Sequence, residues 1–296
     1  MSSPRTYYGS TVAIITPMHD DGSVDYPALE GLIDFHVDAG TTAIVSVGTS
    51  GESATVAVPE HIHLVEHTIN YAAGRIPVVA GTGANSTSEA IELTREAKRI
   101  GADACLLVTP YYNKPTQEGL YQHHKSIAES VDIAQLLYNV PGRTAVDMSV
   151  DTTVRLSEID NIIGIKDATG DLSVAKELVA RCPKDFLLLT GDDATAVEFI
   201  LLGGHGGISV TANVVPAELQ RVYLLAMAGK ADEARALNET ISILHDHLFL
   251  ESNPIPVKWA LHKMGKCGTG IRLPLTVLSN DCQAILAADL QKLNLL

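Results

Sequence analysis

One lysine stands at the end of an apolar run, where a primary amine could act as a nucleophile. Lys166 follows Ile163, Gly164 and Ile165 and precedes Asp167. Lysine is seldom buried, because its ammonium group loses hydration that only a partner can replace. In the mouth of a pocket such a lysine can lose its proton more readily and attack a carbonyl carbon, forming a Schiff base. The alternative is a lysine that points to solvent or pairs with Asp167.

Two further groups of residues could assist an amine nucleophile. Tyr138 stands near the end of the apolar run before that of Lys166, and a phenol beside an imine can pass protons in both directions. The alternative is a tyrosine ring that packs against the rim of the fold. Thr49 and Ser50 lie between two glycines, where hydroxyl and exposed N–H groups suit a carboxylate or phosphate. The alternative there is an ordinary turn between a strand and a helix.

Histidine spacings in one segment are similar to those of metal sites. His61 and His63 form an H-x-H pair, and His63 to His67 fits the H-x-x-E-H spacing of some zinc peptidases. The segment has helical spacing, so His61 and His63 point to different faces. His63 and His67 can share a face, but we expect this helix to lie in an outer layer, away from the strand ends. We therefore expect no metal site and no cofactor.

Eight short apolar runs have the composition of parallel strands that are covered on both faces. They are mostly β-branched or aliphatic and lack polar alternation. The runs are Thr11–Pro17, Ala43–Gly48, Pro77–Thr82, Cys105–Pro110, Ala134–Val140, Asn161–Asp167, Phe186–Asp192 and Gly207–Asn213. Helical segments separate them. Asp25 can cap one of these segments, Pro59 begins another, Ser88 and Glu89 open a third, and Asp171 opens a fourth.

This alternation predicts an α/β protein, a (β/α)₈ or TIM barrel, which takes about 250 residues. We place the barrel in residues 1–230 and a C-terminal helical extension in residues 231–296. A doubly wound open sheet is the alternative, but no G-x-G-x-x-G motif follows the first run. Active sites of such barrels lie at the carboxyl ends of the strands. Thr49, Tyr138 and Lys166 all stand at such ends.

Composition and charge exclude several classes of protein. Of 296 residues, 46% are hydrophobic and 19% charged, as in ordinary globular proteins. A formal net charge of −14 argues against nucleic acid or an anionic membrane as a partner. No apolar run approaches the roughly 20 residues that span a bilayer, and the first residues lack the apolar core of a signal peptide. The four cysteines lie far apart. We therefore expect a cytoplasmic protein without disulfides.

Three motifs together resemble the pyruvate-dependent class I aldolase family. They are Gly48-Thr49-Ser50-Gly51-Glu52, Tyr138-Asn139-Val140-Pro141 with Arg143-Thr144, and Gly164-Ile165-Lys166-Asp167-Ala168-Thr169-Gly170. The resemblance covers nearly the whole chain and is strongest to the dihydrodipicolinate synthase branch of the family. It implies a lyase that condenses pyruvate with L-aspartate 4-semialdehyde, giving 4-hydroxy-tetrahydrodipicolinate in lysine (diaminopimelate) biosynthesis.

Other members of the family leave alternatives open. N-acetylneuraminate lyase and sugar-acid aldolases share the lysine, the tyrosine and the barrel, but they accept polyhydroxylated aldehydes. Arg143 favours the semialdehyde, because a guanidinium group suits a second carboxylate. A non-catalytic barrel that binds a small molecule is an alternative of another class. Such a protein would not need the lysine, two tyrosines and the hydroxyl-rich loop together.

The resemblance also implies the catalytic residues and the assembly. Lys166 forms the Schiff base with pyruvate, and Tyr138 is the proton donor and acceptor. Thr49 and Tyr112 complete the proton relay. In this family Tyr112 reaches the site from a neighbouring subunit, so the resemblance implies an oligomer, usually a homotetramer.

Four residues are implied to bind substrate. Ser50 and the backbone of Ile208 match positions that contact pyruvate, and Gly191 belongs to the same set. Arg143 matches the guanidinium group that holds the carboxylate of the semialdehyde. Position 50 is Ser where the pattern usually has Thr, so the hydroxyl group is kept and a methyl group is lost.

Some members of the family are inhibited by L-lysine at a second site between subunits. The residues that match this effector pocket are Ser53, Ala54, His61, Asn85, Glu89 and Tyr111. Glu89 offers an anion for an ammonium group, and Tyr111 offers a phenol for a carboxylate. Val58 stands where some sensitive enzymes have a histidine, which removes one polar contact. We expect L-lysine to be an effector. The alternative is that Glu89 only stabilises the first turn of its helix.

Overall fold

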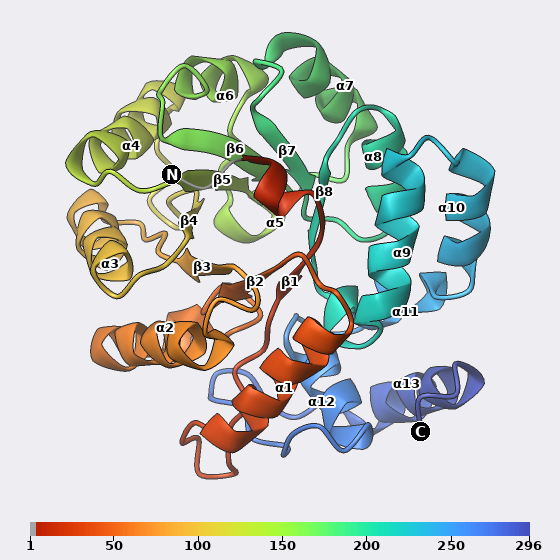
Figure 1. Ribbon diagram of the computed structural model, residues 1–296. Coiled ribbons are helices and arrows are strands. Elements are labelled where there is room, and N and C mark those ends of the chain that lie inside the picture. The colour runs from red at the N-terminus through yellow and green to blue at the C-terminus, as the bar shows by residue number, and fades with distance from the viewer. Residues whose placement is uncertain (1–3) are drawn as a thin grey trace.

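The computed structural model describes residues 4–296, and within them eight parallel strands form a closed barrel (Figure 1). Each strand pairs with the next one along the chain, and β8 pairs with β1. The strands are β1 (Gly9–Ala13), β2 (Ala43–Ser46), β3 (Val78–Gly81), β4 (Ala104–Val108), β5 (Gln135–Asn139), β6 (Ile162–Asp167), β7 (Leu187–Thr190) and β8 (Gly206–Ser209). The predicted TIM barrel is confirmed.

Burial of the strands on both faces explains their unbroken apolar composition. Apart from Val108, every strand residue is buried. Alternate side chains, such as Val45, Leu106 and Leu136, fill the barrel interior. The others pack against the helices; Ile44, for example, belongs to a second cluster that continues into the helical layer.

The helical layer surrounds the barrel, as Figure 1 shows. Its helices are α1 (Tyr26–Asp38), α2 (Val58–Ala72), α3 (Thr87–Arg99), α4 (Gln117–Ser130), α5 (Pro141–Thr144), α6 (Val150–Leu156), α7 (Leu172–Arg181), α8 (Ala196–Leu201) and α9 (Pro216–Met227). Asp25 and Asp171 cap the first turns of α1 and α7, as predicted. The carboxylate of Asp25 accepts a hydrogen bond from Ala28 N, and that of Asp171 accepts one from Ser173 N.

The last predicted run extends too far. Strand β8 ends at Ser209, and Thr211–Asn213 form a 3-10 helix, η3. Polar side chains impose this turn, because Ser209 Oγ accepts a hydrogen bond from Ala212 N. Asn213 Nδ2 donates to the carbonyl oxygen of Ala13, which attaches the turn to β1. The first strand likewise ends at Ala13, four residues before the end of its run.

Four helices follow the barrel: α10 (Ala231–Glu239), α11 (Ser242–His247), α12 (Ile255–Lys263) and α13 (Asn280–Lys292). Figure 1 shows α12 and α13 on the same side of the barrel as α1, and α12 packs on α13. Helix α12 also packs on η3, so the segment before it reaches the end of the barrel where the strands finish. The domain boundary that we place at residue 230 stays a prediction. Between residues 4 and 296, no helix is both long enough and apolar enough to cross a membrane.

Candidate active site

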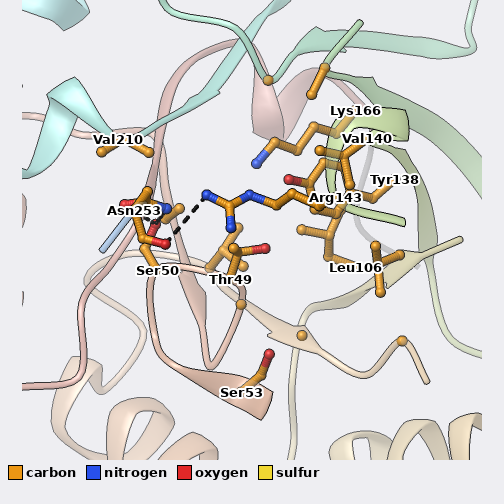
Figure 2. Close-up of a pocket in the computed structure, with 18 of the residues that line it drawn as sticks. Thr49, Ser50, Ser53, Leu106, Tyr138, Val140, Arg143, Lys166, Val210 and Asn253 are labelled. Atoms are coloured by element: carbon orange, nitrogen blue, oxygen red, sulfur yellow. Dashed lines mark hydrogen bonds between the residues drawn. The ribbon is translucent and has the colours of Figure 1, made fainter. Parts of the chain in front are cut away.

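A cavity of about 170 Å³ lies at the carboxyl ends of the strands. Figure 2 shows polar side chains from distant parts of the chain around the same space. The residues that line it include Val45, Gly48, Thr49, Ser50, Leu106, Tyr138, Arg143, Lys166, Gly191, Val210 and Asn253. The position agrees with the rule that barrel enzymes act at this end.

Lys166 reaches this cavity from β6 and lies beside Tyr138 of β5. The two residues are register partners, and Lys166 Nζ is 4.3 Å from the centre of the Tyr138 ring. The lysine is only 5% exposed and makes no ion pair with any described residue. The alternative that Lys166 points to solvent or pairs with Asp167 is therefore wrong. The carboxylate of Asp167 instead accepts hydrogen bonds from Asn139 and Thr169.

The absence of a side chain at Gly191 makes room for Lys166. A Cβ atom at this position would lie 2.5 Å from Lys166 Cε and 2.7 Å from Ala168 Cβ, closer than real Cβ contacts allow. We predicted Gly191 as a substrate-binding residue, and it does line the cavity. Its contacts also show that it sets the path of the lysine side chain.

Asn253 connects two of the predicted substrate-binding residues, and we did not predict it. Its side-chain Nδ2 donates to Ser50 Oγ at 3.0 Å, and its backbone carbonyl oxygen accepts from Arg143 Nη2 at 3.3 Å (Figure 2). Asn253 is 5% exposed and lies just before α12. The only trace in the sequence is an Asn-Pro pair ahead of an apolar helix, which marks a helix start and no function.

Three other predicted residues occupy different places. Thr49 lines the cavity together with Tyr138. Ile208 is buried in the barrel interior and is not among the residues that line the cavity, whereas Val210, two residues further along, does line it. Tyr112 lies outside the cavity of its own chain, because its side chain is 90% exposed in the loop after β4.

The residues of the predicted effector pocket lie near this site but are divided among several surfaces. Ser53, Ala54 and Tyr111 line a second cavity of about 340 Å³, which shares Arg143 with the first. Asn85 Nδ2 donates to the carbonyl oxygen of Tyr111 at 3.3 Å.

Glu89 lines a neighbouring groove together with Val58. Burial raises the pKa of Tyr111, and the charge of Glu89 raises it further.

His61 is buried and points at the barrel. We expected the histidines of this helix to lie away from the strand ends, and for His61 this expectation is wrong. Its Nε2 atom is 2.7 Å from the carbonyl oxygen of Gly81, the last residue of β3. A carbonyl oxygen only accepts, so Nε2 carries the hydrogen. The reason for the error is direction: α2 runs back along the barrel, so it begins where the strands end. Burial lowers the pKa of His61, which favours the neutral ring.

Known proteins similar to this chain share its fold and length. The model of the dihydrodipicolinate synthetase family matches residues 6–293. A 4-hydroxy-tetrahydrodipicolinate synthase of Ruthia magnifica subsp. Calyptogena magnifica is 64% identical over 97% of each chain. A dihydrodipicolinate synthase of Acinetobacter baumannii complexed with pyruvate is 55% identical, with a TM-score of 0.97, over 98% of this chain and 100% of the other.

A dihydrodipicolinate synthase of Cyanidioschyzon merolae with lysine bound is 36% identical, with a TM-score of 0.95, over 98% of this chain and 99% of the other. These relatives confirm the predicted synthase branch and the predicted lyase class, and they do not support the sugar-acid aldolase alternative. The chain belongs to the dihydrodipicolinate synthetase family.

Proposed function

We propose that this enzyme condenses pyruvate with L-aspartate 4-semialdehyde through a Schiff base on Lys166, giving 4-hydroxy-tetrahydrodipicolinate. The observation that carries the assignment of the nucleophile is the position of its amine. Among residues 4–296, Lys166 is the only lysine that lines the cavity, and it lies against Tyr138. An amine without an ion-pair partner is free to attack a carbonyl group.

The proposed reaction proceeds in two stages. The Lys166 amine attacks C2 of pyruvate, and water leaves as the imine forms, with Tyr138 passing the protons. Loss of a proton from C3 gives an enamine, whose C3 attacks the aldehyde carbon of the semialdehyde. The amino group of that substrate then attacks the imine carbon, closes the ring and releases Lys166. One water molecule is lost for each pair of substrates.

The choice of aldehyde tests this function. We expect the enzyme to form product from pyruvate and L-aspartate 4-semialdehyde. We expect it to form no product from pyruvate and N-acetylmannosamine. Product can be followed by mass spectrometry with each aldehyde at equal concentration. Efficient consumption of N-acetylmannosamine would assign the enzyme to the N-acetylneuraminate lyases instead.

Arg143 is proposed to hold the carboxylate of the semialdehyde. We expect Arg143→Ala to weaken use of the semialdehyde while pyruvate capture changes little, because the guanidinium group lies at the mouth of the cavity. Loss of a charge-assisted hydrogen bond costs about 2–3 kcal/mol, roughly a 30- to 150-fold rise in KM. Steady-state kinetics with each substrate varied would measure this. Arg155→Ala, on an exposed helix face, is the control. Equal damage to both half-reactions would contradict the role.

Tyr112 is proposed to act in the site of a neighbouring subunit of a homotetramer. Its 90% exposure in one chain leaves its phenol free to enter another. We expect a mixture of Tyr112→Phe and Lys166→Ala chains to regain up to about a quarter of wild-type activity. If the chains that share a site pair at random, half of these pairs are mixed. One of the two sites in each mixed pair is complete, so a quarter of all sites are complete. Each variant alone is the control. No recovery in mixed oligomers verified by mass would place Tyr112 in its own subunit's site.

L-lysine is proposed to bind between subunits near Glu89 and Tyr111. We expect saturable binding to the wild type by calorimetry and binding weakened at least tenfold in Glu89→Ala, because a charged hydrogen bond contributes about 1.5–3 kcal/mol. Glu92→Ala is a matched control, since Glu92 lines the same groove on the same helix. Equal binding to both variants would contradict the proposal.

The compartment is proposed to be the cytoplasm. The four cysteines, Cys105, Cys182, Cys267 and Cys282, are free thiols, which agrees with a reducing environment.

A further inference from the structure

A buried ion pair joins the hydroxyl-rich loop of the site to the C-terminal helices. Glu52 ends this loop, which carries Thr49 and Ser50, and its Oε1 atom bonds to Nζ of Lys258 on α12. The two side chains are 1% and 4% exposed. The residues are 206 positions apart in the chain, so the contact belongs to the tertiary fold.

Both carboxylate oxygens of Glu52 have partners. Oε2 accepts a hydrogen bond from the backbone N–H of Arg272 at 3.1 Å. The guanidinium group of Arg272 in turn binds the carboxylate of Glu60 with two nitrogens, at 2.6 and 2.7 Å. Glu52 and the chain that follows it, up to Glu60, are therefore held by the C-terminal segment.

A second contact joins the same two segments inside the cavity. Ser50, two residues before Glu52, bonds to Asn253, five residues before Lys258 (Figure 2). The backbone of the loop is also constrained at Glu52. Glu52 has a φ of 59°, a left-handed conformation that a residue with a side chain keeps only when its surroundings hold it. The ion pair is thus in a position to set where Ser50 points.

Stability alone does not explain a buried ion pair at this place. Desolvation of two charges offsets most of their attraction, and well-packed apolar side chains are often as stable. What an ion pair with satisfied hydrogen bonds can add is a single arrangement of the parts that it joins.

We propose that Glu52 and Lys258 are positioning residues that hold Ser50 where it binds the carboxylate of pyruvate. The inference rests on the proposed function, because it takes Ser50 as a pyruvate-binding residue.

The test compares kinetics of three variants of the full chain. Lys258→Met leaves Glu52 buried without its partner, so this variant can also fail to fold. The double variant Glu52→Gln/Lys258→Met removes both charges and keeps the side-chain volumes, and thermal unfolding would verify that it folds. Lys263→Met, an exposed lysine of the same helix, is the matched control.

We expect the double variant to have a pyruvate KM raised about tenfold to a hundredfold, with kcat at saturating pyruvate reduced far less. This range corresponds to about 1.4–2.7 kcal/mol, the size of a lost hydrogen bond to a charged group. If the pair were merely structural, the folded double variant would have the pyruvate KM of the wild type. A wild-type pyruvate KM in the folded double variant, or a fall in kcat without a rise in KM, would overturn the proposal.

Borohydride trapping separates this proposal from the proposed function. If the wild type forms no pyruvate adduct on Lys166, the proposed function fails. If the wild type forms the adduct and the double variant forms it at the same pyruvate concentrations as the wild type, only the positioning role fails.

Discussion

Replacing Lys166 with alanine is expected to abolish covalent capture of pyruvate and to lower kcat at least about a thousandfold. The amine supplies the bond through which pyruvate becomes a carbon nucleophile, and the reaction has no second route of similar rate. Within the described part of the chain, no other lysine lines the cavity. The measurement is mass spectrometry of the intact protein after borohydride reduction in the presence of pyruvate.

Lys176→Ala is the matched control, because Lys176 is an exposed lysine of α7, the helix that follows β6. It should form the adduct as the wild type does, and digestion should locate the adduct on Lys166. A pyruvate-sized adduct that persists in Lys166→Ala would show that another residue is the nucleophile.

The second large effect is expected from Gly191→Ala, a change of one methyl group. The added Cβ atom would lie 2.5 Å from Lys166 Cε, so the lysine side chain must leave its present path. Because a displacement of about 1 Å at a reacting group can cost about a hundredfold, we expect a loss of this size in the rate of Schiff-base formation. Single-turnover kinetics with pyruvate would measure it directly.

Two further variants test the reason for this loss. Gly31→Ala should have wild-type kinetics, because a Cβ atom at Gly31 meets nothing within 4 Å. Removing the methyl group of Ala168, which would lie 2.7 Å from the new Cβ atom, should restore part of the rate in Gly191→Ala/Ala168→Gly. An unchanged rate in Gly191→Ala would show that Lys166 does not need the space.

The fold and the centre of the candidate site could be predicted because their signals are local. Parallel strands covered on both faces must be apolar throughout, so all eight appeared as short runs that helical segments separate. Tyr138 and Lys166 stand near the carboxyl ends of successive strands, and neighbouring parallel strands of a barrel present their ends side by side. The motifs around them then indicated the family. Composition does not fix the ends of the runs, as η3 shows, because a serine or asparagine side chain can turn the backbone where composition still favours a strand.

Contacts between distant segments left no such signal in the sequence. Asn253 meets Ser50 across 203 positions, and Glu52 meets Lys258 across 206. Neither partner stands out alone, since an asparagine before a proline and a glutamate after a glycine occur in ordinary turns. Gly191 is similar: its place at a strand end was visible, but the closeness of Lys166 depends on how β6 and β7 pair. Periodicity reports which face of an element is buried, whereas the partner on that face is chosen by the packing of the whole barrel.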